Sequence, residues 1–105
     1  MVKTAKPQVK ARKQPDKRLG KVPTEYVFWC HDGKVFADLA ELAEGLAAIS
    51  DETFAYHSNA EKQDFSNWIR DVIGDKLLAE YLANTTDRLQ AGDYVTARIT
   101  WLTEK

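Results

Sequence analysis

Hydrophobic side chains recur at helical spacing between residues 50 and 75, and this pattern predicts two helices joined by a sharp corner. In the second helix, a stripe with i, i+3, i+4, i+7 spacing holds Phe65, Trp68, Ile69 and Val72. A stripe that contains a phenylalanine and a tryptophan can bury more apolar area than any other segment of this chain. We therefore expect it to start the core, with the Trp68 indole inserted where the two helices meet.

Residues 25–36 predict a β-hairpin, because aromatic and β-branched residues lead into an Asp-Gly turn pair at 32–33. Strand alternation sends Phe28 and Tyr26 to one face of the hairpin and Trp29 to the other. One face must cover the helices, since an isolated hairpin is only marginally stable in water. The other face either exposes aromatic side chains to a partner or is covered by the C-terminal segment. The residues of the possible partner surface are Tyr26, Phe28 and Trp29.

Polar residues that cap helix N-termini divide the rest of the chain into short helices. Glu41 and Glu61 each follow a cap by three residues, which is the spacing of a capping box. Gly45 costs the first helix some stability but permits a close helix contact, and Gly74 supplies the left-handed residue that ends the third helix. The expected N-terminal caps are Asp38, Ser50, Ser58 and Asp75, and residues 84–87 (Asn-Thr-Thr-Asp) hold a stop followed by a new cap.

The last segment supports two interpretations. Leu89, Val95, Ile99 and Leu102 form a helical stripe, whereas residues 94–102 also alternate between apolar and polar side chains as in a strand. The length of the segment and the cap signals before it favour a helix over a third strand.

These elements predict an α+β fold that is mainly α, with an N-terminal hairpin followed by four to five short helices. The side chains of the fourth helix that we expect to face inward are Leu77, Leu78, Tyr81 and Leu82. The core predicted from all helices consists of Leu39, Leu42, Leu46, Phe54, Phe65, Trp68, Ile69 and Val72.

The composition of the 105 residues, 44% hydrophobic and 30% charged, is typical of a soluble globular protein with one modest core. No apolar run approaches the roughly 20 residues of a membrane span, and no apolar segment follows the basic N-terminus as in a secretion signal. Cys30 is the single cysteine, so an internal disulfide is excluded and a reducing, cytoplasmic location is expected.

The charge is divided sharply along the chain. Residues 1–22 hold eight basic side chains and one acidic one, a net charge of +7, while residues 23–105 carry −8. The basic segment has two prolines and no aromatic residue, so we predict a disordered arm that precedes a single globular domain beginning at Pro23. The arm could contact DNA or RNA phosphates, bind an acidic surface of a partner or of this chain, or only add solubility. Its possible phosphate contacts are Lys3, Lys6, Lys10, Arg12, Lys13, Lys17, Arg18 and Lys21.

A resemblance to a known family rests on three segments: F-W-C-H-D-G-K-V-F-A-D-L-A-E-L-A-E-G-L (28–46), S-D-E-T-F-A-Y-H (50–57) and D-F-S-N-W-I-R-D-V-I-G-D (64–75). Together they resemble a small uncharacterised prokaryotic domain, a domain of unknown function with a hairpin, a D-L-x-E-L helix and an F-x-x-H…D-F-x-x-W-I-x-D-V-x-G-D core motif. Its members stand alone or are attached to larger enzymes, including carbohydrate-active ones. The resemblance covers residues 25–82, favours a helix for the C-terminal segment and implies no activity.

The best candidate for chemistry is the set His57, Asp64 and Asp71. The corner between the two helices could bring His57 against Asp64 or the Trp68 indole. A general acid/base pair is one interpretation, with Asp64 orienting the imidazole. The favoured interpretation is a polar clasp that fixes the angle between the helices.

A second candidate, Cys30-His31-Asp32, has the residue types of a catalytic set but not the arrangement. Catalytic partners converge from separated positions, and on a strand Cys30 and His31 point to opposite faces. We expect Cys30 to be half-buried in the hairpin. Two histidines and one cysteine also fall short of a structural zinc site, so we expect no metal and no cofactor.

Two functions from different classes remain. The favoured one is a non-enzymatic interaction module that docks on a protein partner through its acidic helical face or its hairpin aromatics. The alternative is a nucleic-acid-associated protein whose basic arm contacts DNA or RNA while the body binds another molecule. An enzyme would have to use His57 and Asp64, and we expect neither catalysis nor membrane contact.

Overall fold

The computed structural model describes residues 15–105. The elements are η3 (Lys17–Leu19), η4 (Thr24–Tyr26), β2 (Phe28–Trp29), β3 (Val35–Phe36), α1 (Leu39–Ala48), α2 (Asp51–His57), α3 (Asp64–Trp68) continued by the π-helical turn η5 (Ile69–Ile73), α4 (Lys76–Ala83) and α5 (Arg88–Glu104). The predicted fold class, a hairpin followed by helices, is confirmed.

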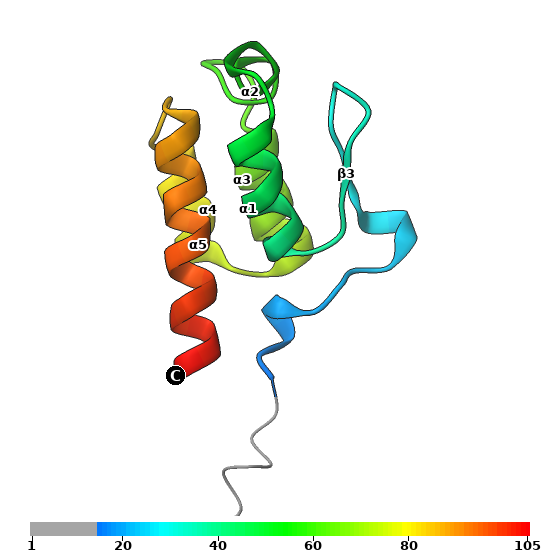
Figure 1. Ribbon diagram of the computed structural model, residues 1–105, viewed down its shortest axis with the longest axis vertical. Helices are drawn as coiled ribbons and strands as arrows, with labels where there is room; N and C mark the ends of the chain where they lie inside the picture. The colour runs from blue at the N-terminus through cyan, green and yellow to red at the C-terminus, as the bar shows by residue number, and fades with distance from the viewer. Residues whose placement is uncertain (1–14) are drawn as a thin grey trace, which may run out of the picture.

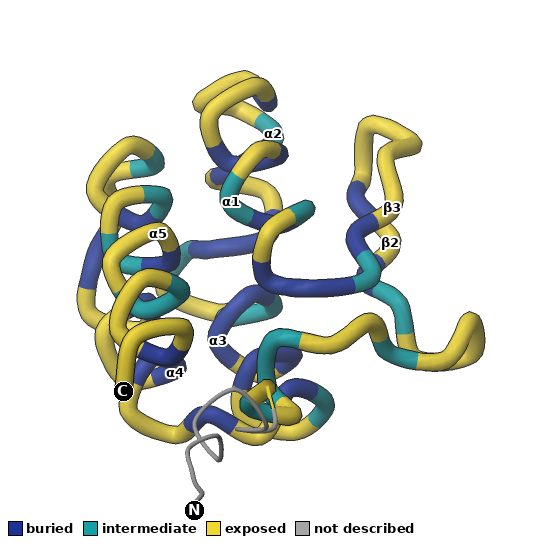
Figure 2. The backbone as a smooth tube through the Cα atoms, turned by 60° about the horizontal axis from the view of Figure 1, so that its bottom comes forward, coloured by how far each residue is buried: buried dark blue, intermediate teal, exposed yellow. Residues whose placement is uncertain are grey.

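The hairpin and α5 lie on opposite sides of the molecule, with α1 and α3 between them and α4 behind α5 (Figure 1). Exposed and buried stretches alternate along α5 (Figure 2), as expected for a helix that covers the core with one side. The C-terminal segment is therefore the expected helix and not a third strand. Val95 and Leu102 are buried on this side, and α5 packs along α1.

Side-chain caps begin most of the helices as predicted. Asp38 accepts a hydrogen bond from the Glu41 amide at 2.8 Å, and the Glu41 carboxylate accepts one from the Ala37 amide at 2.7 Å. Ser50, Asp75 and Asp87 cap α2, α4 and α5 in the same way. Gly74 ends η5 with a φ of 88°, in the left-handed region that glycine adopts without strain.

The expected capping box of Ser58 and Glu61 is wrong. Ser58 ends α2, since its amide donates to the Phe54 carbonyl, and α3 begins only at Asp64 without a side-chain cap. The carboxamide oxygen of Asn59 accepts hydrogen bonds from the amides of Glu61 and Lys62 instead. The asparagine thus folds the loop into a local turn that competes with an earlier helix start.

A column of four stacked rings forms the aromatic part of the core, and it uses every phenylalanine of the chain. In this phenylalanine column, the ring centroids of Phe36 and Phe28 are 6.0 Å apart, those of Phe28 and Phe65 4.8 Å, and those of Phe65 and Phe54 5.6 Å. The column crosses from the hairpin through α3 to α2, so it joins three elements with offset-stacked contacts.

The predicted core is buried except for Val72, which is half-buried at its margin. The expected place of Trp68 is wrong, because Phe65 and Phe54 fill the corner between α2 and α3. The Trp68 ring instead packs edge-on against Phe28 of the hairpin, with centroids 5.9 Å apart.

The expected inner face of α4 is only half correct. Leu78 and Leu82 are buried, but Leu77 and Tyr81 are about half exposed. With 3.6 residues per turn, one stripe of a short helix reaches the core, and Leu77 and Tyr81 lie on a neighbouring stripe.

The boundary between arm and domain lies before Pro23, contrary to our prediction. Leu19 and Val22 pack against the core, and Asp16 caps η3 and pairs with Arg18 at 2.7 Å and with Lys105 at 3.1 Å. Hydrogen bonds from Arg18 hold the pKa of Asp16 far below its usual range. Residues 15–22 therefore belong to the folded body, and residues 1–14 lie outside the described residues. None of the helices within residues 15–105 is long and apolar enough to cross a membrane.

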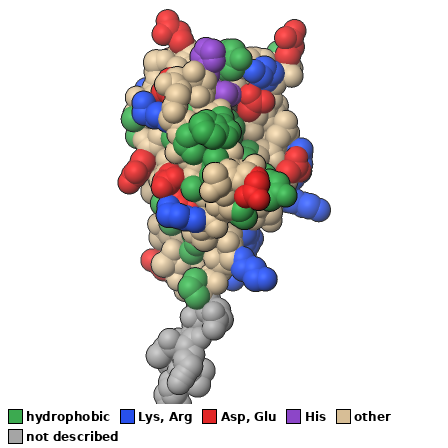
Figure 3. Space-filling model, turned by 90° about the vertical axis from the view of Figure 1, so that its right-hand side faces the viewer, with side chains coloured by type: hydrophobic (Ala, Val, Ile, Leu, Met, Phe, Trp, Pro, Cys, Tyr) green, Lys and Arg blue, Asp and Glu red, His purple; other side chains and the backbone are tan. Residues whose placement is uncertain are grey.

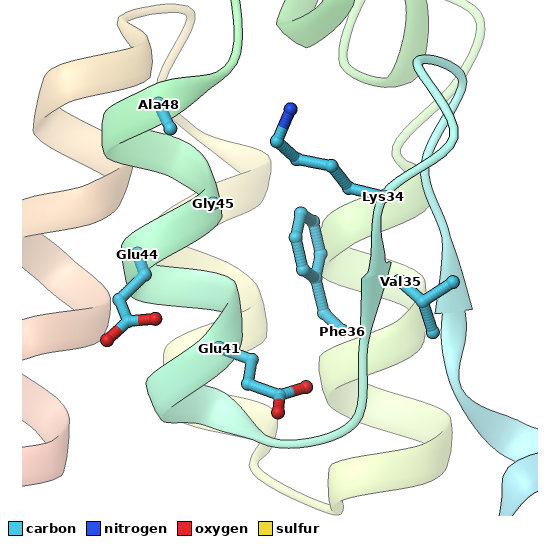
Figure 4. Close-up of a pocket in the computed structure, with 7 residues that line it drawn as sticks. All are labelled: Lys34, Val35, Phe36, Glu41, Glu44, Gly45 and Ala48. Carbon is cyan, nitrogen blue, oxygen red and sulfur yellow. The ribbon is translucent and has the colours of Figure 1, made fainter.

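Gly45 makes room for the hairpin and not, as expected, for another helix. The Phe36 ring points from β3 toward α1 at this position (Figure 4), and a Cβ atom added to Gly45 would lie 2.2 Å from its Cζ atom. Phe36 is buried in the column, so the ring has little freedom to move away.

We predict that Gly45→Ala lowers the free energy of unfolding by about 1–3 kcal/mol, because the added methyl group overpacks the core. Gly92→Ala in α5 is the matched control, since its Cβ would meet only Leu46 Cβ at an ordinary 3.6 Å. The control should raise stability by about 0.5–1 kcal/mol through helix propensity. Urea denaturation of both variants measures the difference, and equal effects would contradict the close packing of Phe36.

Candidate functional site

His57 and Asp64 meet across the corner between α2 and α3, as predicted. His57 is 5% exposed, and its Nδ1 lies 2.9 Å from Oδ2 of Asp64. Its Nε2 accepts a hydrogen bond of 2.9 Å from the backbone amide of His31 at the hairpin tip. We call this arrangement the His57 clasp: the His57 ring, the Asp64 carboxylate and the His31 amide.

The clasp fixes the tautomer of His57. A backbone N–H can only donate, so Nε2 must accept and the proton resides on Nδ1, which donates to Asp64. The ring also packs edge-on against Phe28 and Phe65. Because both nitrogens have protein partners and the ring is buried, the geometry favours the structural interpretation over proton transfer to a substrate.

Asp71 does not join this cluster. Seven residues separate it from Asp64, which is two turns or about 10 Å along the helix axis. Its carboxylate pairs instead with Arg70 at 3.0 Å on the surface.

Cys30 points into the core and is buried, more deeply than expected, while the His31 ring lies outside and stacks on Tyr56 with centroids 3.8 Å apart. Burial raises the pKa of the Cys30 thiol, which disfavours the nucleophilic thiolate. The two side chains therefore diverge, as strand alternation predicts. Within residues 15–105, no group of three His, Cys, Asp or Glu side chains could hold a metal ion.

Three large hydrophobic side chains in and next to the hairpin are exposed, and we call them the hairpin face: Tyr26, Trp29 and Val35. Trp29 is 68% exposed and pairs with Val35 across the two strands. Hydrophobic side chains gather in the middle of the hairpin side of the molecule (Figure 3). The C-terminal helix lies on the opposite side (Figure 1), so it does not cover them.

The expected partner surface is only partly correct: Phe28 lies on the face opposite Trp29, as strand alternation predicts, whereas Tyr26 does not follow that alternation. Phe28 is buried in the phenylalanine column and cannot touch a partner. Tyr26 belongs to the turn η4 and not to a strand, and its side chain is exposed. Val35 was not predicted, because a two-residue Asp-Gly turn would place Phe36 opposite Trp29, whereas the observed loop of residues 31–33 places Val35 there.

The backbone under the hairpin face is held at both ends. At the base, the Trp68 indole Nε1 donates to the Tyr26 carbonyl at 2.7 Å. At the tip, His57 accepts from the His31 amide, and Gly33 closes the turn with a φ of 97°. The buried helices thus set the position of the exposed residues between these two points.

The expected phosphate contacts lie largely outside the described residues: Lys3, Lys6, Lys10, Arg12 and Lys13. Of the three described ones, Arg18 is bound to Asp16, and Lys21 lies 3.1 Å from Asp38 and 2.9 Å from Glu41. Lys17 is exposed. Nucleic-acid binding by the arm stays a prediction.

No protein-family model, curated protein or solved structure matches the chain. The resemblance to the small prokaryotic domain of unknown function therefore also stays a prediction.

We predict that His57→Ala lowers the free energy of unfolding by about 1–3 kcal/mol, because it leaves the His31 amide and the Asp64 carboxylate without the imidazole that bonds both. His31→Ala is the matched control, since it removes an exposed ring but keeps the backbone amide that His57 accepts from. Its cost should stay below about 1 kcal/mol. Urea denaturation measures both. Equal losses, or none for His57→Ala, would show that the clasp does not hold the hairpin tip.

Proposed function

We propose that this chain is a non-enzymatic interaction module that docks on a protein partner through the hairpin face. The observation that carries the proposal is Trp29, a 68% exposed indole on a short hairpin whose tip and base are both hydrogen-bonded to buried side chains. Large aromatic side chains supply much of the energy of protein interfaces when a partner encloses them.

Preorganisation supports the same function. Binding usually costs entropy because loops and side chains must be ordered. Here the Trp68 and His57 hydrogen bonds already fix the strands that carry Trp29 and Val35. A partner would therefore meet an ordered apolar surface and would order little more than the Trp29 side chain.

A hollow beside the hairpin face suits a side chain of the partner. It has a volume of about 490 Å³ and is lined by Val22, Pro23, Tyr26, Asp71 and Val72. Val22, Pro23 and Val72 give it an apolar wall, and Tyr26 and Asp71 contribute polar atoms. We infer that the partner presents an apolar pocket for Trp29 and an apolar side chain for this hollow. With a single cysteine the chain has no internal disulfide, as is usual in a reducing compartment, so we place this interaction in the cytoplasm.

We predict that Trp29→Ala abolishes capture of the partner from an extract of the source cells, with affinity reduced at least about thirtyfold, as for an aromatic hot spot. Trp101→Ala is the matched control, because Trp101 is also an exposed tryptophan but lies on α5, on the other side of the molecule. It should leave capture of that partner unchanged. Circular dichroism confirms that both variants fold. Retention of the partner by Trp29→Ala, or equal loss by Trp101→Ala, would reject docking through the hairpin.

A further inference from the structure

A second apolar surface lies opposite the hairpin, along the junction of α4 and α5. We call it the α4–α5 face: Leu77, Tyr81, Tyr94, Ala97 and Trp101. Leu77, Tyr81 and Trp101 are 46%, 47% and 53% exposed. Such a row of large apolar side chains is unusual for a surface that meets only water.

The aromatic rings of this face are held in place. Tyr81 of α4 stacks on Tyr94 of α5, with centroids 5.1 Å apart and planes 24° from parallel. The guanidinium carbon of Arg98 lies 4.6 Å from the centre of the Trp101 ring, and the Arg98 Nε donates to the fully buried Asp75 at 2.7 Å. An ion pair anchored in the core thus supports the exposed indole from below.

The arrangement suits a helix as partner. Asp75 contacts Arg98 and Tyr81 contacts Tyr94, so α4 and α5 run antiparallel side by side. Along α5 the apolar positions follow i, i+3, i+7 spacing, and along α4 they follow i, i+4. A third helix that packs along the junction could contact both helices through apolar residues with the same i, i+3, i+4, i+7 spacing. The 17 residues of α5 span about 25 Å, which an 18-residue partner helix matches.

Charge decides which helix fits. Glu80 follows Leu77 by one turn, and Asp93 and Glu104 lie on the helix stripe of Ala97, so three carboxylates flank the face on both sides, against the exposed Lys76 at the start of α4. Within residues 15–105, none of these three forms an ion pair, whereas the basic residues of α5 are bound to Asp51 and Asp75. A second copy would bring like charges together around the rim, so the charge favours a basic occupant.

We propose that the α4–α5 face is a second docking site, which binds a basic amphipathic helix: apolar residues at i, i+3, i+4 and i+7 cover the aromatic row, and lysine or arginine residues beside them pair with the acidic rim. This site is independent of the hairpin face. The chain then has two binding surfaces for two different partners.

The test uses a fluorescein-labelled synthetic peptide of 18 residues with leucines on one helical stripe and lysines elsewhere. A peptide of the same composition with the leucines scattered controls for charge alone. Fluorescence anisotropy with the full chain should show binding by the striped peptide at least about tenfold tighter than by the scattered one. Binding should weaken as salt is added, because the rim charges are exposed to solvent.

Variants locate the site. Trp101→Ala and the charge reversal Asp93→Lys should each weaken binding of the striped peptide at least about fivefold, and Asp93→Lys changes only an exposed residue, so the fold is not at risk. Trp29→Ala should bind the peptide like the unaltered chain, which separates this site from the hairpin face. Equal binding of both peptides, unchanged affinity of both face variants, or loss through Trp29→Ala would overturn the proposal. Sedimentation of the chain as a dimer that Trp101→Ala dissociates would also overturn it, in favour of a second copy.

Discussion

The stacking of Phe28 and Phe36 on Phe65 and Phe54 is the contact on which the hairpin depends. Its two strands pair over only two residues each, and an isolated hairpin of that size is marginal in water. Full burial of a phenylalanine side chain contributes about 2–3 kcal/mol, so the two hairpin rings together offset that weakness. Because neighbouring strand residues point to opposite faces, burying Phe28 also turns Trp29 outward. The exposed indole is thus a consequence of how the core is anchored.

The sequence predicts helix caps well, because their signals are local. It predicts side-chain packing poorly where that packing depends on segments far apart in the chain. Asp38, Asp75 and Asp87 cap helices because a carboxylate reaches amides only two or three residues away. Ser58 and Asn59 both offer such a signal, and the asparagine turn prevails. Local sequence does not determine which side chain fills the corner between α2 and α3. Phe65 and Trp68 share a stripe, and the position of the hairpin assigns Phe65 to the corner and Trp68 to β2.

In the candidate site, too, the contact between residues close in sequence is predictable and the contact between distant residues is not. His57 and Asp64 are seven residues apart on either side of a corner, so their contact follows from the predicted helices. The partner of the other ring nitrogen is an amide 26 residues away, which no spacing in the sequence reveals. The hydrogen bond from that amide changes the role that we infer for the His57–Asp64 pair. An imidazole with one free nitrogen beside a carboxylate resembles a general base, whereas one that also accepts from a backbone amide joins the hairpin tip to the helices.

The two proposed docking surfaces rest on different parts of the core. The hairpin face is held by the phenylalanine column, Trp68 and His57, whereas the α4–α5 face is held by the Asp75–Arg98 pair and the Tyr81–Tyr94 stack. No side chain of one set belongs to the other, and α1 and α3 lie between them (Figure 2). Sites without shared contacts contribute independently, so filling one surface should leave the affinity of the other unchanged. Such a domain would act as a scaffold. Two partners bound on opposite sides of one small rigid domain are kept at a fixed separation and at a high effective concentration relative to each other.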